Sequence, residues 1–259
     1  LGRRQGEIPR TEAVAHERGI RIGLRSVHVV GRRHVQNQVR PVRAHGLANA
    51  REVRDVEFLV REGRDLMTEA LGLCLPSSTS IPAMDAAHSR MATDCGERIV
   101  DMVWEDLKPS NILTRGSFQN ALAVQMALGG STNAAVHIIA LARRAGVHLT
   151  LADLDAMAQR VPVIANLFPS GDKLMEDFYY AGGLPALMKT IHGNLSMNEL
   201  TVTGKSLGAN IEHAVVHDPE VIRPLDKPVS TAGALAVLKG NLAPHGAVIK
   251  PSAANPRFM

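Results

Sequence analysis

The chain has 259 residues, of which 45% are apolar and 21% charged, and its formal net charge is +4. This is the composition of an ordinary folded protein, long enough for one large domain or two modest ones. Two cysteines exclude a disulfide-rich secreted scaffold, and no apolar stretch approaches the roughly 20 residues of a membrane helix. We therefore expect no membrane partner and a cytoplasmic location. Because the first residue is Leu1, we do not expect the chain to start at a natural start codon.

The positive charge is confined to the first quarter of the chain. Residues 1–64 contain 14 Arg, no Lys and 7 acidic residues, whereas residues 65–259 contain 8 Arg, 7 Lys and 18 acidic residues. Three hypotheses stay open for residues 1–64: a nucleic-acid-binding arm, a divergent folded segment, or a reading frame translated out of register. Basic arms usually mix Lys with Arg, and single-strand binders add stacking aromatics, but Phe58 is the one aromatic here. The segment is therefore left unassigned, and nucleic acid is not the expected partner.

Regular helix signals begin near residue 65. Capping residues, apolar periodicity and the positions of Pro and Gly predict a series of helices in the first half of this region. These helices span Leu66–Leu73, 82–94, Ile99–Leu107, a segment capped by Thr114 or Ser117 that reaches Leu128, and Ala134–Ala145. The last of these is apolar almost all round, which predicts that most of its surface is buried.

Helices and short strands alternate from residue 150 onward. A capping box at Thr150–Asp153 predicts a helix that ends before Pro162. The remaining expected elements are a buried strand over 161–167, helices over 173–181 and from Pro185, a short strand over 200–203, a helix over 206–214, and two strands over 233–238 and 246–250. The fold class is thus α/β: a helix-rich α/β domain over residues 65–224, followed over 225–259 by the start of a truncated β-rich second domain.

One glycine-containing turn resembles a ligand site. Gly129-Gly130-Ser131-Thr132-Asn133 stands between two expected helices, where free amides and hydroxyls can hold a carboxylate or phosphate. The same residues are also what a tight helix–helix corner needs, and this alternative stays open. Ser170, in the turn 169–171, is a second candidate for contact with a ligand. The candidate substrate-binding residues are therefore Ser131, Thr132, Asn133 and Ser170.

The residues alone supply no catalytic or metal set. Cys74 and Cys95 are 21 residues apart without a CxxC pair, so we predict small buried side chains rather than zinc or cluster ligands. His137 lies in an apolar helix without an acidic or Cys neighbour at helical spacing, which favours a structural histidine. No catalytic residue and no metal ligand is therefore assigned.

A series of motifs over about 195 residues resembles a known family. The most characteristic are Leu71–Pro76, 106–109, 127–133, 169–171, 175–178, 181–185 and Lys250–Ala254. Their order and spacing are similar to the middle of the dihydroxy-acid dehydratase / phosphogluconate dehydratase family. The run Lys250-Pro251-Ser252-Ala253-Ala254 is similar to the sugar-acid branch, such as arabinonate dehydratases.

The resemblance implies a hydro-lyase. Such an enzyme removes water from a 2,3-dihydroxy acid to give a 2-keto-3-deoxy acid, with an iron–sulfur cluster and Mg²⁺ as Lewis acids and a serine as the base. Family members form dimers, so a homodimer is compatible with the resemblance. The favoured substrate is an aldonate; a dihydroxy acid of branched-chain amino-acid biosynthesis is the alternative.

None of the family's catalytic or cofactor ligands can be carried over to this sequence. The resemblance places one cluster cysteine a dozen or so residues before Thr68, where residues 55–60 contain no cysteine. The other ligands and the catalytic serine belong to family segments outside the matching residues. We therefore expect this chain to be a dehydratase fragment that is inactive by itself. Nucleic-acid binding through residues 1–64 is the alternative from another class.

Overall fold

The computed structural model describes residues 65–168 and 170–254. The chain divides into two units, Leu1–Arg54 and Asp55–Met259, and every described residue belongs to the second unit. Residues 1–64 lie outside the described residues. The hypotheses about this segment therefore stay predictions, and so does the expectation that a cluster cysteine of the family is missing near residues 55–60.

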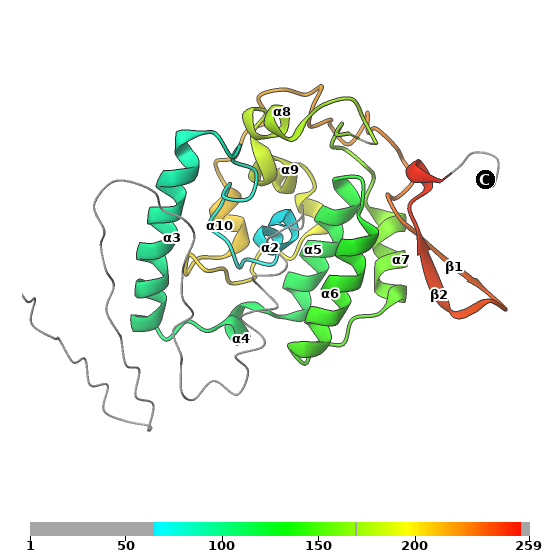
Figure 1. Cartoon of the computed structure of the whole chain (residues 1–259), viewed down its shortest axis with the longest axis horizontal. Helices are drawn as coiled ribbons and strands as arrows, with labels where there is room; N and C mark the ends of the chain where they lie inside the picture. Colours follow the sequence, from blue (N-terminus) through cyan, green and yellow to red (C-terminus); the bar gives the residue numbers. More distant parts are fainter. Residues whose placement is uncertain (1–64, 169, 255–259) are drawn as a thin grey trace, which may run out of the picture. The chain divides into compact units, whose positions relative to one another are not determined.

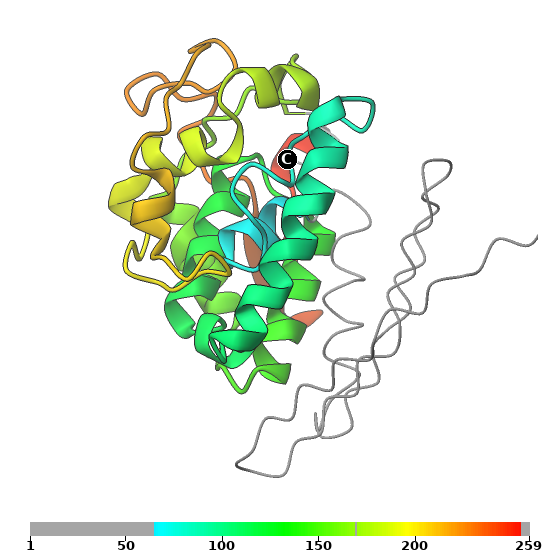
Figure 2. The same cartoon turned by 90° about the vertical axis from the view of Figure 1, so that its left-hand side faces the viewer.

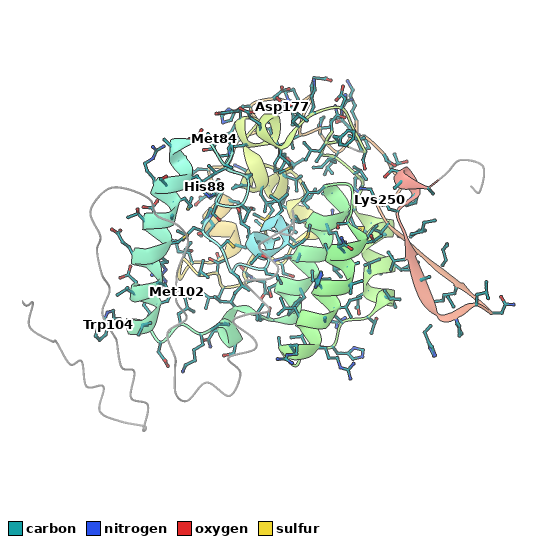
Figure 3. All side chains as sticks on the ribbon, viewed as in Figure 1. Met84, His88, Met102, Trp104, Asp177 and Lys250 are labelled. Carbon is teal, nitrogen blue, oxygen red and sulfur yellow. The ribbon has the colours of Figure 1, made fainter. Side chains whose placement is uncertain are left out.

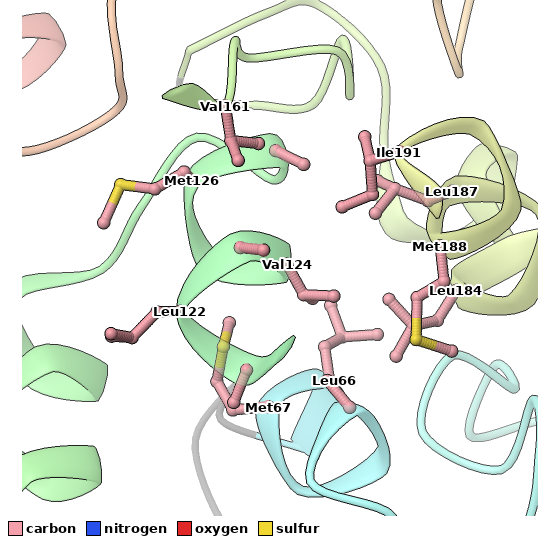
Figure 4. Packing of buried hydrophobic residues seen from close by; sticks show 14 of the residues in the cluster. Leu66, Met67, Leu122, Val124, Met126, Val161, Leu184, Leu187, Met188 and Ile191 are labelled. Carbon is pink, nitrogen blue, oxygen red and sulfur yellow. The ribbon is translucent and has the colours of Figure 1, made fainter. Parts of the chain in front are cut away.

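Helix α5 (Arg115–Ala127) is the centre of the described unit. Around it are α2 (Asp65–Ala70), α6 (Thr132–Arg144), α7 (Leu151–Arg160) and α9 (Gly183–Thr190), as Figure 1 shows. In the close view of Figure 4, Leu66 of α2 and Leu184 of α9 approach Val124 of α5 from different sides. One contiguous apolar core therefore joins segments that are more than a hundred residues apart in the sequence.

The N-terminus of α5 is capped by Thr114, one of the two caps that the sequence predicts. Thr114 accepts a hydrogen bond from the backbone N–H of Ser117, and Ser117 Oγ accepts one from the N–H of Thr114 at 3.0 Å. The Thr114 hydroxyl also donates to the carboxylate of Glu199. A carboxylate is favourable there because the N-terminus of a helix carries partial positive charge.

Asn120 of α5 is a polar residue whose side chain is buried in the core. Its Oδ1 accepts from the backbone N–H of Ser196 at 2.6 Å, and its Nδ2 donates to the carbonyl oxygen of the same residue at 3.0 Å. Both polar ends of the amide are thereby paired, as burial requires. The segment around Ser196 is thus attached to α5 by hydrogen bonds as well as by packing.

Two expected strands are extended chain rather than regular strands. Residues 161–167 are almost entirely buried, but Val163, Ala165 and Leu167 pair only through isolated bridges, to Ser230, Ile222 and Lys173. The predicted strand over 200–203 was wrong, because Leu200 pairs back with Ser206 across a turn. A buried apolar run in this fold satisfies its backbone with loops rather than with a sheet.

The helices expected over 82–94 and 99–107 are one continuous helix, α3 (Ala86–Trp104). A single Gly96 costs a helix only about 1 kcal/mol relative to Ala, and no Pro stands nearby to end it. The prediction that most of α6 is buried was also wrong. Its buried residues are Ala134, Ala135, Ile138, Leu141 and Ala142, whereas Val136 is exposed, so only one face packs inward.

The C-terminal strands form the expected antiparallel hairpin, β1 (Ala236–Gly240) and β2 (Ala243–Ile249). Strand β1 contacts α7, and the structure is helix-rich with this small sheet near its end, which confirms the α/β fragment. Within the described residues no helix is both long and apolar enough to cross a membrane. The remaining elements are α4 (Pro109–Ile112), α8 (Met175–Tyr180), α10 (Leu207–Ile211), and the 3₁₀ turns η1 (His192–Asn194) and η2 (Pro251–Ala253).

Candidate functional site

The turn between α5 and α6 has the geometry of a helix corner with open amides. Ser131 is the N-cap of α6, and its hydroxyl accepts from the backbone N–H of Ala134 at 3.3 Å. The predicted candidates Thr132 and Asn133 are the first residues of α6, and both are exposed. The first N–H groups of a helix have no partner inside it, so they face outward and are available to an anion.

Both glycines of this turn are required by their surroundings. Gly129 and Gly130 have φ of 97° and 71°, values that favour glycine. A Cβ on Gly130 would lie 2.8 Å from the side chain of Ala234 and 2.9 Å from that of Leu235. A Cβ on Gly129 would lie 3.1 Å from Ser170 Oγ. The segment before β1 and the Ser170 turn therefore pack directly against the glycines.

The structure brings together all four predicted candidates. Ser170 lies against Gly129. Gly129 belongs to the same turn as Ser131, Thr132 and Asn133. Its hydroxyl is also within 3.2 Å of the hydroxyl of Ser252, in the turn that follows β2. The end of the hairpin thus closes over the α5–α6 turn. We name these residues, Gly129 to Asn133 with Ser170, Lys250 and Ser252, the α6 corner.

Lys250 is the residue that the candidate assignment missed. Its ammonium donates to the carbonyl oxygen of Gly130 at 3.0 Å, and Figure 3 shows it where the hairpin meets the helices. Burial lowers the pKa of Lys250, and within residues 65–168 and 170–254 no carboxylate forms a salt bridge with it. The signal in the sequence was its place in the family-like run Lys250–Ala254, which identified a branch but no contact.

A buried amide borders the α6 corner. Gln125 is fully buried; its Nε2 donates to the carbonyl oxygen of Ser131 at 2.6 Å, and its Oε1 has no hydrogen-bond partner. An unpaired buried acceptor costs about 1–3 kcal/mol, so a donor at this position would stabilise the corner. The α6 corner itself combines a cation with open amides, which suits an anion, and Gln125 holds the Ser131 carbonyl from below.

The described residues do not fit a metal or cluster site. In residues 65–168 and 170–254 no group of three His, Cys, Asp or Glu side chains is arranged to hold a metal ion. Cys95 is exposed and Cys74 half-buried, so the prediction that both are buried was wrong; α3 is uncovered where Cys95 lies. The iron–sulfur cluster and Mg²⁺ remain predictions.

Comparison with family models shows which family the chain belongs to. Residues 63–210 match the dihydroxy-acid/6-phosphogluconate dehydratase N-terminal model, and residues 220–259 match the corresponding C-terminal model. The first match alone covers more than half of the chain. The chain belongs to this family. Family members are dehydratases, which is the hydro-lyase class that the motifs indicated.

Similar curated proteins carry sugar-acid and dihydroxy-acid names. The chain is 52% identical over 195 residues to the 6-deoxy-6-sulfo-D-gluconate dehydratase of Pseudomonas putida, covering 74% of this chain and 34% of that protein. It is 50% identical over 196 residues to the L-arabonate dehydratase of Azospirillum brasilense, with shares of 74% and 34%. It is 48% identical over 195 residues to the dihydroxy-acid dehydratase of Caldicellulosiruptor bescii, with shares of 74% and 35%. The chain spans about a third of the length of these relatives.

Proposed function

We propose that this chain is the sugar-acid-binding part of a dehydratase that converts a 2,3-dihydroxy acid to a 2-keto-3-deoxy acid and water. The observation that carries the proposal is the contact between Lys250 and Gly130 at the start of α6. A partly buried ammonium without a carboxylate partner in the described region, beside free helix amides, favours a bound anion. The family supports a hydroxy acid as the source of that anion.

The α6 corner offers separate groups to the two ends of such a molecule. Lys250 and the amides of Thr132 and Asn133 would hold the carboxylate of the acid. The hydroxyls of Ser170 and Ser252 would bond to hydroxyls along the sugar chain, because each can both donate and accept. These contacts would orient the acid, and none of them transfers a proton. Binding by this chain can therefore be tested separately from catalysis.

We propose further that the chain does not turn the acid over by itself. The described residues contain no arrangement of side chains for a metal ion, and the chain covers about a third of its relatives. An aldonate is the favoured substrate because proteins named for sulfogluconate and arabonate are among the relatives about 50% identical to this chain. The relative named for dihydroxy acids, at 48%, makes the branched-chain precursor the alternative.

Calorimetric titration of the whole chain with L-arabinonate, D-gluconate and 2,3-dihydroxy-isovalerate tests the binding. Lys250→Met should weaken aldonate binding about tenfold or more, because a charge-assisted hydrogen bond contributes about 1.5–3 kcal/mol. Lys239→Met is the matched control, since Lys239 is an exposed lysine of the same hairpin. Equal binding by both variants, or preference for the isovalerate, would contradict the proposal.

An activity assay tests the second part. The purified chain, incubated with iron, sulfide, Mg²⁺ and each acid, should form no 2-keto acid detectable with semicarbazide. Product formation above a protein-free control would show that the chain is a complete enzyme. The two assays are independent, because binding can succeed whether or not turnover occurs.

A further inference from the structure

Asn166 is a buried polar residue just before the Ser170 turn. It is 8% exposed, and its carbonyl oxygen accepts from the backbone N–H of Lys173 at 3.0 Å, where the chain leaves the turn. The backbone N–H of Asn166 donates to the carbonyl oxygen of Val221 at 2.8 Å. In Figure 2 the yellow-green chain that leads into α8 lies beside the orange chain that follows α10. The two ends of the turn are therefore fixed to each other and to a neighbouring segment.

The side chain of Asn166 is hydrogen-bonded at both ends of its amide. Its Nδ2 donates to Oδ1 of Asp172 at 2.7 Å and to the carbonyl oxygen of Glu220 at 3.1 Å. Its Oδ1 accepts from the backbone N–H of Asp172 at 3.3 Å. An amide supplies two donors and an acceptor, so an apolar residue of similar size would leave these partners without their bonds.

Gly171 lies directly on Asn166. A Cβ on Gly171 would lie 2.2 Å from Asn166 Oδ1 and 2.5 Å from the carbonyl carbon of the same residue. The backbone N–H of Gly171 also donates to the carbonyl oxygen of Leu167 at 2.7 Å. Asn166 thus contacts Gly171 and binds Asp172, the two residues that follow Ser170. The position of the Ser170 backbone therefore depends on Asn166.

The Ser170 hydroxyl reaches the α6 corner from this anchor. Its Oγ lies 3.2 Å from Ser252 Oγ, and a Cβ on Gly129 would lie 3.1 Å from it. Because a serine side chain has one rotatable bond before its oxygen, a shift of the backbone moves the hydroxyl by a similar distance. Groups that bind a ligand must be held within about 0.5 Å of their working position, and supporting hydrogen bonds do this.

We propose that Asn166 is a positioning residue, which holds the Ser170 hydroxyl where it bonds to a hydroxyl of the acid at the α6 corner. The proposal rests on the function proposed above, in which Lys250 binds the carboxylate. Asn166 then determines selectivity, because an acid without hydroxyls leaves Ser170 unpaired, whereas an aldonate provides its partner. Without the Asn166 amide, the chain should distinguish less between the two kinds of acid.

Calorimetric titration of the whole chain with D-gluconate and with hexanoate tests the role of Asn166. Hexanoate has the same number of carbons and the carboxylate but no hydroxyl groups. Asn166→Leu should weaken gluconate binding about three- to tenfold, as expected for one lost hydrogen bond, and should leave hexanoate binding unchanged. Unchanged gluconate binding, or an equal loss for both acids, would overturn the proposal, since an equal loss indicates a general structural role.

A double-mutant cycle shows whether Asn166 acts through Ser170. Ser170→Ala should weaken gluconate binding by about the same factor as Asn166→Leu, and the double variant should bind no more weakly than Ser170→Ala. If the two losses multiply, Asn166 affects binding by a separate route and the proposal is wrong. A wild-type chain that binds no gluconate would contradict the proposed function, and this proposal with it.

A milder variant keeps the test decisive if Asn166→Leu lacks the far-ultraviolet circular dichroism spectrum of the wild-type chain. Asp172 is exposed, and Asp172→Ala removes the carboxylate to which Asn166 Nδ2 donates. The lost negative charge affects both acids alike, so the ratio of gluconate to hexanoate affinity should fall about two- to threefold through the lost bond. Glu176→Ala, which removes another exposed carboxylate, is the matched control and should leave the ratio unchanged. An unchanged ratio in Asp172→Ala would overturn the proposal.

Discussion

Helices α5 and α3 have a similar fraction of apolar residues but differ greatly in how many of those residues are buried. Ten of the 13 residues of α5 are buried, whereas α3 buries one residue of 19. The apolar side chains of α5 are surrounded by α2, α6, α7 and α9. Those of α3 form two rows, one turned inward at Met102 and one left exposed. Apolar content therefore reports that a helix needs neighbours, and the neighbours decide how much of it is buried.

The largest expected effect separates these two helices by stability. Phe118 of α5 is fully buried, and Phe118→Ala should lower the free energy of unfolding by about 3–5 kcal/mol, because it removes packing and leaves a cavity. Val103→Ala on α3 should change it by no more than about 0.5 kcal/mol, as is usual for exposed sites. Urea unfolding of both variants gives the measurement. A loss at Val103 comparable to that at Phe118 would mean that the chain itself covers this side of α3.

The second effect comes from a buried acid on α2, the helix that packs on α5. Glu69 is 3% exposed, and its carboxylate accepts from the N–H of Ser77 at 2.7 Å and the hydroxyl of Thr79 at 2.6 Å. Burial raises the pKa of Glu69 from 4.5 to about 7, although these hydrogen bonds lower it. The folded protein therefore holds a proton on Glu69 that the unfolded chain releases between pH 4.5 and 7.

Stability should accordingly decrease as pH rises through this window. The contribution of Glu69 is most favourable below pH 4.5 and is lost by pH 7, a difference of roughly 3 kcal/mol. Urea midpoints at pH 5 and pH 8 measure it, and Glu69→Gln should reduce the difference between the two because the amide does not titrate. If Glu69→Gln has the pH dependence of the wild-type chain, the buried carboxyl is not its source.

Local signals were sufficient to predict most helix starts. Thr114 or Ser117 is predicted to cap α5, and the structure uses Thr114. Ser131, one of three good capping residues in its turn, caps α6. In the predicted capping box of α7, the carboxylate of Asp153 accepts from the backbone N–H of Thr150. Caps are readable because donor and acceptor lie within three residues of each other.

Features that depend on distant residues were not readable in this way. Whether α6 is covered on one face or on several depends on α5 and on segments elsewhere, so its exposed Val136 could not be foreseen from periodicity. The contact between Lys250 and Gly130 joins residues 120 positions apart. The candidate serines were found because they share one turn or a recognisable Pro-Ser-Gly motif, whereas the lysine that completes the corner comes from the hairpin.

The smallest expected effect lies in the segment that links the buried α2 to the exposed α3. Ser77 has φ of 67°, in the left-handed region, where a side chain costs roughly 1–2 kcal/mol. Its backbone N–H holds Glu69, and Ser77→Gly keeps that bond while removing the steric cost. Glycine also makes the unfolded chain more flexible, so the net gain should be about 0.5–1 kcal/mol. Ser77→Ala is the control, since it removes the hydroxyl but keeps a Cβ in the left-handed region, and it should bring no such gain. A urea midpoint that rises for Ser77→Gly and not for Ser77→Ala would show that the conformation of residue 77 limits the stability of this link. A loss in both variants would mean that the Ser77 side chain contributes more than its φ costs.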